Sequence, residues 1–163
     1  MLTARSLLPT EDEVRVALGP DVRLEPASST APAGGAGGVI KAAAADSAFR
    51  RFAGSLLQAP EPSPMAVSAL ALVFESAPMA MHTFTQVAEA AHLRVQLDGS
   101  SVAVETVTAP SGLVSYWGFV HRDRAIVVLT LDTVDPQRLS VGSLRSLASI
   151  AAKRLEAATA SRD

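Results

Sequence analysis

The chain has no cysteine among its 163 residues. This absence excludes disulfides, thiol nucleophiles, and zinc or iron–sulfur sites with cysteine ligands. A chain of this length buries roughly 70% of its unfolded surface, so it needs neither a disulfide nor a metal to stay folded. We therefore expect residues 1–163 to form a single domain. The absence of cysteine does not decide the cellular compartment, because an exported domain of this size can also fold without disulfides.

Aromatic and charged residues are also scarce, at 4% and 18% of the chain. Fourteen basic residues stand against sixteen acidic ones, which gives a formal net charge of −2. This balance provides no long-range attraction to nucleic acid or to acidic lipid. Hydrophobic residues make up 48%, which is typical of globular domains. The composition thus predicts a globular protein that does not bind nucleic acid.

Long apolar runs are missing as well, since no segment approaches the ~20 apolar residues that a membrane-spanning helix needs. The opening segment, MLTARSLLPTEDE, lacks the apolar core of a signal peptide. Two explanations remain open. Either the protein is cytoplasmic, or the chain starts after a signal or anchor and reaches the membrane only through that missing segment.

The segment LLPTEDEVRVALGPDVRLEP, residues 7–26, contains clear helix signals. Thr10 can cap a helix while Glu13 reaches back to it, which is the reciprocal capping box. The following Gly-Pro pair ends the helix, so we predict a helix over about 11–18. Alternating apolar residues then predict a short strand over 21–25.

The next segment, residues 26–40, is rich in Gly, Ala, Pro and Ser and predicts a flexible loop. Its GGAGG run lacks the Lys-Ser/Thr of a phosphate-binding loop. Residues 41–58, KAAAADSAFRRFAGSLLQ, predict a helix, because a stripe of apolar residues includes Phe49 and Phe52. Residues 65–74, MAVSALALVF, predict a buried strand.

A helix is predicted from the cap at Ser76 to about residue 92, because its apolar residues recur at helical spacing. After this helix, the apolar residues recur at every second position, which is the spacing of a strand. We predict four strands joined by short turns, which form an antiparallel meander: LRVQL, SVAVETVT, LVSYWGFVH and RAIVVLTLD. A helix over about 140–158 and a frayed tail over 159–163 follow. The fold class is α+β, with an antiparallel sheet of five or six strands and helices mainly on one face.

Catalytic and metal-binding patterns are weak. His82 and His92 are ten residues apart, and only Glu89 and His92 have a helical spacing that suits one ion. The cluster around His121 and Asp123 lies at one turn, whereas triads assemble from distant segments, and no G-x-S-x-G motif is present. We predict no catalytic residue, no metal site and no cofactor.

The few aromatic residues concentrate near the third strand of the meander. On a strand, Trp117 and Phe119 face one side and Tyr116 faces the other. These side chains either fill the core under a helix or form a pocket between sheet and helix with Trp117 as its floor. Methionines near the start of the second long helix could line such a cavity. The candidate ligand-binding residues are Trp117, Tyr116, Phe74, Met79, Met81 and Phe84.

Two segments resemble a known family. The opening LLPTEDEVRVALG and the closing AIVVLTLDTVDPQRLSVGSLRSLASIAAKRL are similar to the ends of actinobacterial extracytoplasmic sensor-like domains. Such domains occur in mycobacterial receptor Ser/Thr kinases and in related lipoproteins. The kinase sensor domains typically contain paired cysteines, which this chain lacks. The resemblance implies a non-enzymatic, extracytoplasmic or cell-surface domain that binds a ligand or a partner, and it assigns no site residue.

Three functional hypotheses follow. The first is a sensor-like domain that binds a small apolar ligand or a protein partner. The second is a cytoplasmic homodimeric assembly protein that associates through a sheet face, because the last two strands are apolar on both sides. The third is a small α+β hydrolase or isomerase, which would need a polar pocket residue with a shifted pKa. The polar residues considered for that role are His82, His121, Asp132 and Glu105.

Overall fold

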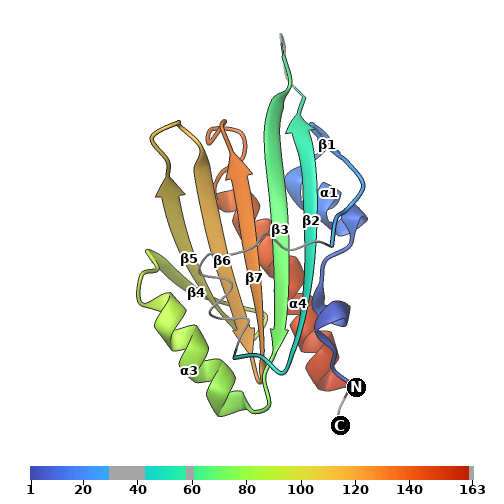
Figure 1. Ribbon diagram of the computed structural model, residues 1–163, viewed down its shortest axis with the longest axis vertical. Helices are drawn as coiled ribbons and strands as arrows, with labels where there is room; N and C mark the ends of the chain where they lie inside the picture. Colours follow the sequence, from blue (N-terminus) through green and yellow to red (C-terminus); the bar gives the residue numbers. More distant parts are fainter. Residues whose placement is uncertain (30–42, 58–60, 162–163) are drawn as a thin grey trace.

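The computed structural model describes residues 1–29, 43–57 and 61–161. They form one seven-stranded antiparallel sheet with the order β1-β2-β3-β7-β6-β5-β4 (Figure 1). The α+β class is confirmed, but the sheet has seven strands instead of five or six. The strands are β1 (Val22–Leu24), β2 (Asp46–Leu56), β3 (Ser63–Val73), β4 (Leu93–Leu97), β5 (Ser100–Thr108), β6 (Val114–Arg122) and β7 (Ala125–Thr133).

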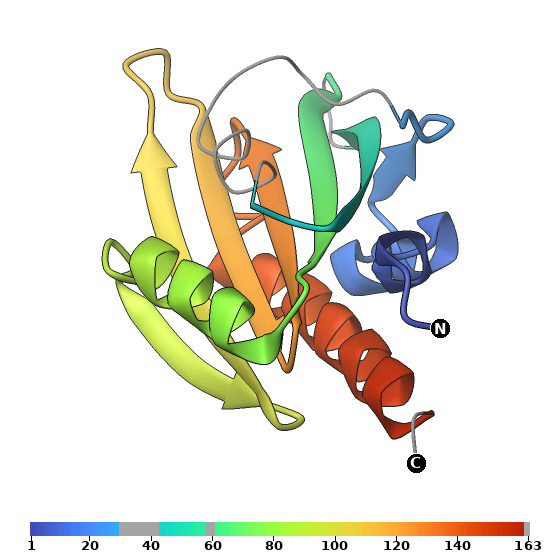
Figure 2. The same cartoon turned by 60° about the horizontal axis from the view of Figure 1, so that its bottom comes forward.

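Helices cover both faces of the sheet (Figure 2). The 3₁₀ helix η1 (Ala4–Leu7), α1 (Glu11–Leu18) and α4 (Val141–Ala160) pack on one face, and α3 (Ala77–Ala88) packs on the other. We expected helices mainly on one face; η1, α1 and α4 do share a face, but α3 covers the opposite one. The reason is that β6 and β7 carry apolar side chains on both sides, so a helix must bury these side chains on each face of the sheet. Within the described part of the chain, no helix is long and apolar enough to cross a membrane.

The predicted meander is confirmed. Strands β4, β5, β6 and β7 pair in sequence, each antiparallel to the next. The first turn is tight because Asp98 and Gly99 both have positive φ, at 48° and 74°. Positive φ at both central residues is typical of a type I′ hairpin, which matches the right-handed twist of the strands.

The helix predicted over 41–58 is wrong where the structure describes it. Residues Asp46–Leu56 are strand β2 and pair with β3 along their whole length, from Asp46 opposite Val73 to Leu56 opposite Ser63. Tertiary pairing of eleven residues has overridden a local preference for helix. Residues 41, 42 and 58 lie outside the described residues.

The N-terminal predictions are confirmed. The Glu13 amide donates to Thr10 Oγ1 at 3.2 Å, and the Thr10 amide donates to Glu13 Oε2 at 2.7 Å, so the capping box is complete. Of the predicted flexible loop, residues 30–40 lie outside the described residues, and Ser28 forms an isolated bridge with Arg51 of β2. At the other end, α4 continues to Ala160, and residues 162–163 also lie outside the described part.

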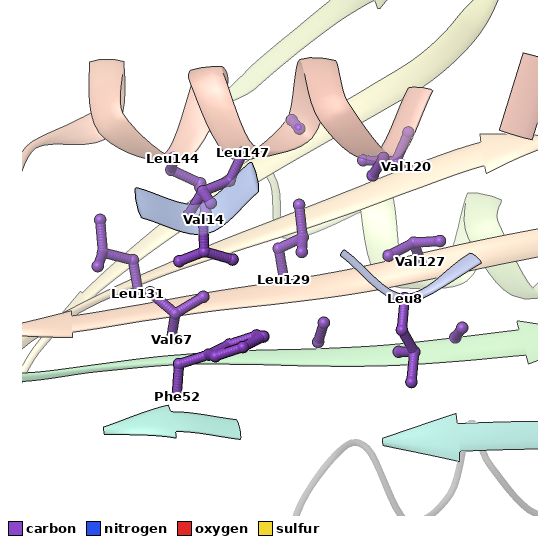
Figure 3. Close-up of a cluster of buried hydrophobic side chains, with 14 of the residues drawn as sticks. Leu8, Val14, Phe52, Val67, Val120, Val127, Leu129, Leu131, Leu144 and Leu147 are labelled. Atoms are coloured by element: carbon purple, nitrogen blue, oxygen red, sulfur yellow. The ribbon is translucent and has the colours of Figure 1, made fainter. Parts of the chain in front are cut away.

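The main core lies between the sheet and α4. Figure 3 shows side chains from the strands and from α4 meeting in one layer. Gly118 of β6 packs against α4, and a Cβ at this position would be in ordinary van der Waals contact with the Leu144 side chain, at 3.4 Å. The labelled residues of this layer are Leu8, Val14, Phe52, Val67, Val120, Val127, Leu129, Leu131, Leu144 and Leu147.

An ion pair fixes α1 against α4. Arg154 donates from Nη2 and Nε to Glu13 Oε2, at 2.8 and 3.0 Å, and its Nη1 donates to the Ser6 carbonyl at 3.0 Å. The two ends of the chain meet here, since Met1 and Ser161 line one pocket (Figure 1). Burial alone would raise the pKa of Glu13, but the bonds from Arg154 and Thr10 outweigh it and lower the pKa below 4.5.

We expect Glu13→Gln to lower the free energy of unfolding by about 1 kcal/mol at neutral pH, a value reduced for the partly exposed pair. Because the pKa of Glu13 is lower in the folded state, its contribution is present above pH 4.5 and is lost as the pH falls below that value. Urea unfolding at several pH values measures this. Glu11→Gln, which removes a more exposed pair with Arg15, serves as the control and should change stability less.

Candidate functional site

The face that carries α3 is covered along only part of its length. Near the β6–β7 turn, α3 packs on strands β6 and β7 (Figure 1). The helix begins there because Ser76 caps it by accepting the Met79 amide and Pro78 occupies its first turn. The buried residues of this second cluster are Leu72, Phe74, Ala80, Ala88, Ala103, Phe119, Ile126 and Val128.

Beyond this cluster, the described residues place no helix over the same face of the sheet (Figure 1). Five side chains from adjacent strands lie in one transverse line there, because their residues are paired in register. We name this line the Trp117 row, and its members, from β2 across to β5, are Arg51, Ser68, Thr130, Trp117 and Glu105.

The Trp117 row presents a flat aromatic surface between opposite charges. Trp117 is half-buried and stacks beside Phe119, with ring centroids 6.5 Å apart and planes inclined by 19°. Neighbouring strands are about 4.8 Å apart, so the row extends over roughly 19 Å from Arg51 to Glu105. Such a surface offers stacking in the middle, a cation at one end and a carboxylate at the other.

The next line of residues supplies further polar atoms. Ser115 Oγ donates to Asp132 Oδ1 at 2.6 Å, and both residues are half-buried beside the Trp117 row. The hydrogen bond holds the Asp132 carboxylate in place on the sheet surface. A ligand that stacks on Trp117 would therefore meet fixed acceptors on this side.

Three of the predicted ligand-binding residues lie on this face. Trp117 belongs to the row, while Phe74 and Phe84 pack in the cluster under α3. Phe74 is 1% exposed and lies near the β6–β7 turn, where its amide donates to the Arg124 carbonyl at 2.8 Å, so it does not reach a ligand on the row. The structure therefore places Trp117 in the row and packs Phe74 and Phe84 in the cluster under α3.

The other three predicted residues lie elsewhere. Tyr116 is 7% exposed and packs on the opposite face, in the core under α4, as the alternation of the strand predicted. Met79 and Met81 are exposed on α3, at 41% and 51%. A ligand-binding role for the six residues stays a prediction, but they do not form one pocket.

A small pocket lies between α3 and the β4–β5 hairpin. It has a volume of about 300 Å³ and is lined mainly by Phe84, Arg94, Gln96 and Ser101. Arg94 donates to the Ala88 carbonyl at the end of α3 at 2.6 Å, and Gln96 Nε2 donates to Ser101 Oγ at 2.9 Å. Sequence reasoning missed these three polar residues, although alternation in LRVQL correctly placed Arg94 and Gln96 on one side.

His121 lies beside this pocket, in contact with Phe84. Its ring stacks on Phe84 with centroids 5.1 Å apart, and its Nε2 lies 2.9 Å from the Asp123 carbonyl oxygen. Burial lowers the pKa of His121 below 6.5, although the Asp123 carbonyl and charge partly oppose that effect. The lowered pKa favours the neutral imidazole, which stacks on Phe84 as an aromatic support for α3.

We expect the wild-type protein to lose stability as the pH falls below 6.5, the ordinary pKa of histidine. The unfolded chain then binds a proton that the folded His121 resists, so the free energy of unfolding falls with pH. His121→Phe keeps the stacking and should remove this part of the pH dependence. Urea midpoints at about pH 7.5 and about pH 5 measure the change.

His82→Phe is the matched control, because His82 is exposed on α3. This variant should keep the wild-type pH dependence. If His82→Phe lost the pH dependence of stability, or if His121→Phe kept it, the loss of stability at low pH would come from a group other than His121.

The hydrolase hypothesis gains nothing from the described residues. Four of the pockets lined by described residues contain none of His82, His121, Asp132 and Glu105. The same residues hold no group of three His, Asp or Glu side chains placed to bind a metal ion. Ser115 and Asp132 form a pair without a histidine beside them, so they lack the general base of a triad.

Comparison with known proteins gives one likeness of fold. No known protein family and no curated protein matches this chain. The crystal structure of the extracellular domain of PknH from Mycobacterium tuberculosis is similar, with a TM-score of 0.55 over 96% of this chain and 95% of that chain. The two chains are 11% identical, so the likeness is one of fold alone. This chain therefore shares the fold of that extracellular domain.

Proposed function

We propose that this protein is a non-enzymatic, sensor-like domain that binds a small ligand with a planar apolar group against the Trp117 row. The observation that carries the proposal is the half-buried Trp117, between Arg51 and Glu105, on the part of the face over which the described residues place no helix. Trp117 is the single tryptophan of the chain, and its ring offers an apolar surface on which a planar group can stack.

A location outside the cytoplasm is part of this proposal. The structural neighbour is described as an extracellular domain, and the fold of this chain is like it. The absence of cysteine is compatible with either compartment. Protease accessibility in intact cells that express the full natural gene would test the location, because a cytoplasmic protein would resist digestion until the cells are lysed.

Binding is tested with 8-anilinonaphthalene-1-sulfonate, a planar apolar probe that carries one negative charge. The probe should stack on Trp117 with its sulfonate toward Arg51. Trp117→Ala should weaken its binding by about fivefold to tenfold, the equivalent of one stacking interaction. The probe's own emission reports the binding, since Trp117 is the single tryptophan and its removal abolishes tryptophan emission.

Val16→Ala is the control, because Val16 is an exposed apolar residue on α1, outside the row. It should leave the affinity for the probe unchanged. Equal affinity in the wild type and Trp117→Ala would overturn the proposal. So would probe-induced shifts of backbone amides in nuclear magnetic resonance that lie away from the Trp117 row.

A homodimer formed through this face is the second candidate. The observation that favours it is that Phe49 and Leu70 are half-buried on the same side of the sheet as Trp117, so the face includes an apolar area. Sedimentation distinguishes the two functions. A monomer mass at tens of micromolar protein argues against the dimer, and a dimer whose Trp117 is shielded from iodide quenching argues for it.

A further inference from the structure

Among the described residues, the outer edge of β2 has no strand partner along part of its length. Strand β1 covers only the far end of β2, where Val22 and Leu24 pair with Leu56 and Gly54. An isolated bridge between Ser28 and Arg51 adds one more contact. In the described part of the chain, nothing pairs with residues 46–50 on this side.

Backbone groups of this open stretch are directed outward. Arg51 exchanges both backbone bonds with Ser28, at 2.7 and 2.9 Å, so odd-numbered residues of β2 turn their N–H and C=O groups to the outer edge. Ser47 and Phe49 have the same parity. Their amide and carbonyl groups are therefore available to an added strand, and the described residues supply no partner for them on this side.

Space for such a strand lies beside the edge. A pocket of about 420 Å³ lies along it, and a second pocket of about 370 Å³ shares Arg5, Ser29 and Arg50 with the first. Together they form a groove between η1, the start of α1 and the outer side of β2. The residues that line the first pocket are Arg5, Leu8, Ser29, Ser47, Ala48, Phe49, Arg50 and Leu70.

The groove is positively charged. Arg5 is exposed and makes no ion pair with any described carboxylate, and Arg50 donates to the Pro9 carbonyl at 2.8 Å instead of to an acid. Glu11 also lines the groove, but it is paired with Arg15 of its own helix. Two cations are thus available beside the free strand edge.

One more carboxylate lies at the lower end of this edge. Asp46 accepts the Ala4 amide at 2.8 Å. This bond anchors η1 beside β2 and holds Arg5 at the groove.

We propose that the outer edge of β2 binds an extended acidic segment of a partner protein, which adds to the sheet as a further strand. Main-chain bonds to Ser47 and Phe49 would supply register, and Arg5 and Arg50 would select acidic side chains. Residues 46–50 extend over about 17 Å, enough for about five residues of partner. The site is an edge and is independent of the Trp117 row, which lies on a face.

A second copy of this chain fits the edge poorly. The edge of a second copy presents the same two cations, Arg5 and Arg50, whereas an acidic segment presents carboxylates to them. Charge complementarity therefore favours an acidic partner, which is why we commit to it.

The test uses two fluorescein-labelled peptides, acetyl-Glu-Val-Glu-Val-Glu-amide and acetyl-Lys-Val-Lys-Val-Lys-amide, with binding followed by anisotropy. The acidic peptide should bind and the basic one should not. Hydrogen exchange should show protection of the Ser47 and Phe49 amides when the acidic peptide is bound. Added salt should weaken binding, because the groove is partly exposed.

Two variants examine the two parts of the proposal. Ser47→Pro removes an outward N–H and leaves the bonds to β3, so it should weaken binding at least tenfold, or about 1.4 kcal/mol. Arg5→Glu should weaken binding by about fivefold. Arg145→Glu, an equal charge change on an exposed residue of α4, is the matched control and should have no effect.

Several results would overturn the proposal. They are equal binding of the two peptides, protection at the β4 edge instead of at β2, and equal effects of Arg5→Glu and Arg145→Glu. A dimer mass of the free protein that disappears in Ser47→Pro would assign the edge to a second copy. If Ser47→Pro fails to fold, the two arginine variants and the exchange data decide the question.

Discussion

Phe52→Ala should lower the free energy of unfolding by about 4 kcal/mol, the largest effect that we predict for a single side chain. Phe52 is fully buried and lies in the layer between the sheet and α4 (Figure 3). Its truncation removes apolar contacts and leaves a cavity that β2 and β3 cannot close, because they are paired along their whole length. Urea unfolding followed by circular dichroism measures the loss.

Phe49→Ala is the matched control on the same strand. Phe49 is half-buried and faces the opposite side of the sheet, so its loss should cost about 1 kcal/mol. In a helix, positions 49 and 52 would share one face and the two substitutions would cost similar amounts. Similar losses in the two variants would therefore contradict strand β2.

The second large effect is expected for Gly54→Val. A Cβ at position 54 would lie 2.2 Å from the backbone carbonyl oxygen of Arg23 in β1, far inside van der Waals contact. Strand β1 would have to move away, and Val22 and Leu24 would then lose much of their burial. Exposing these two side chains should lower the free energy of unfolding by about 3 kcal/mol.

Ala53→Val is the control, because Ala53 is half-buried, faces the other side of β2 and precedes Gly54. It should change stability by less than about 0.5 kcal/mol. Hydrogen exchange of the β1 amides gives a second readout and should accelerate in Gly54→Val alone. A Gly54→Val protein as stable as the wild type would show that β1 does not lie against this residue.

Elements with local signals were predicted correctly from the sequence. The capping box of Thr10 and Glu13 identified α1, and Asp98-Gly99 identified the first hairpin of the meander. Each of these signals involves residues within a few positions of one another. Helix α4 was also expected, because its buried residues recur at helical spacing.

Strand β2 was missed because its signal is not local. KAAAADSAFRRFAGSLLQ favours helix by composition, and its strand alternation is weak because Ala48 and Gly54 carry little side chain. Pairing with β3 and β1 decides the outcome, and a single sequence does not reveal it. The count of five or six strands was low for the same reason.

The candidate site was predictable only in part. Trp117 stood out because the chain has a single tryptophan. Its neighbours Arg51 and Ser68 come from strands distant in sequence and meet it only through the register of β2, β3 and β7. The β2 edge was not predicted either, because the segment that forms β2 was predicted to be a helix, and a helix has no strand edge.

The proximity of Met1 and Ser161 beside Arg154 determines how the molecule can be attached to a surface. Both residues occupy one corner, next to η1 and the last turns of α4. A linker joined at Met1 or at Ser161 therefore holds the protein at the same corner, and mechanical load enters through the helices instead of the sheet. Immobilisation through Met1 or through Ser161 should leave the Trp117 row and the β2 edge equally accessible from solution.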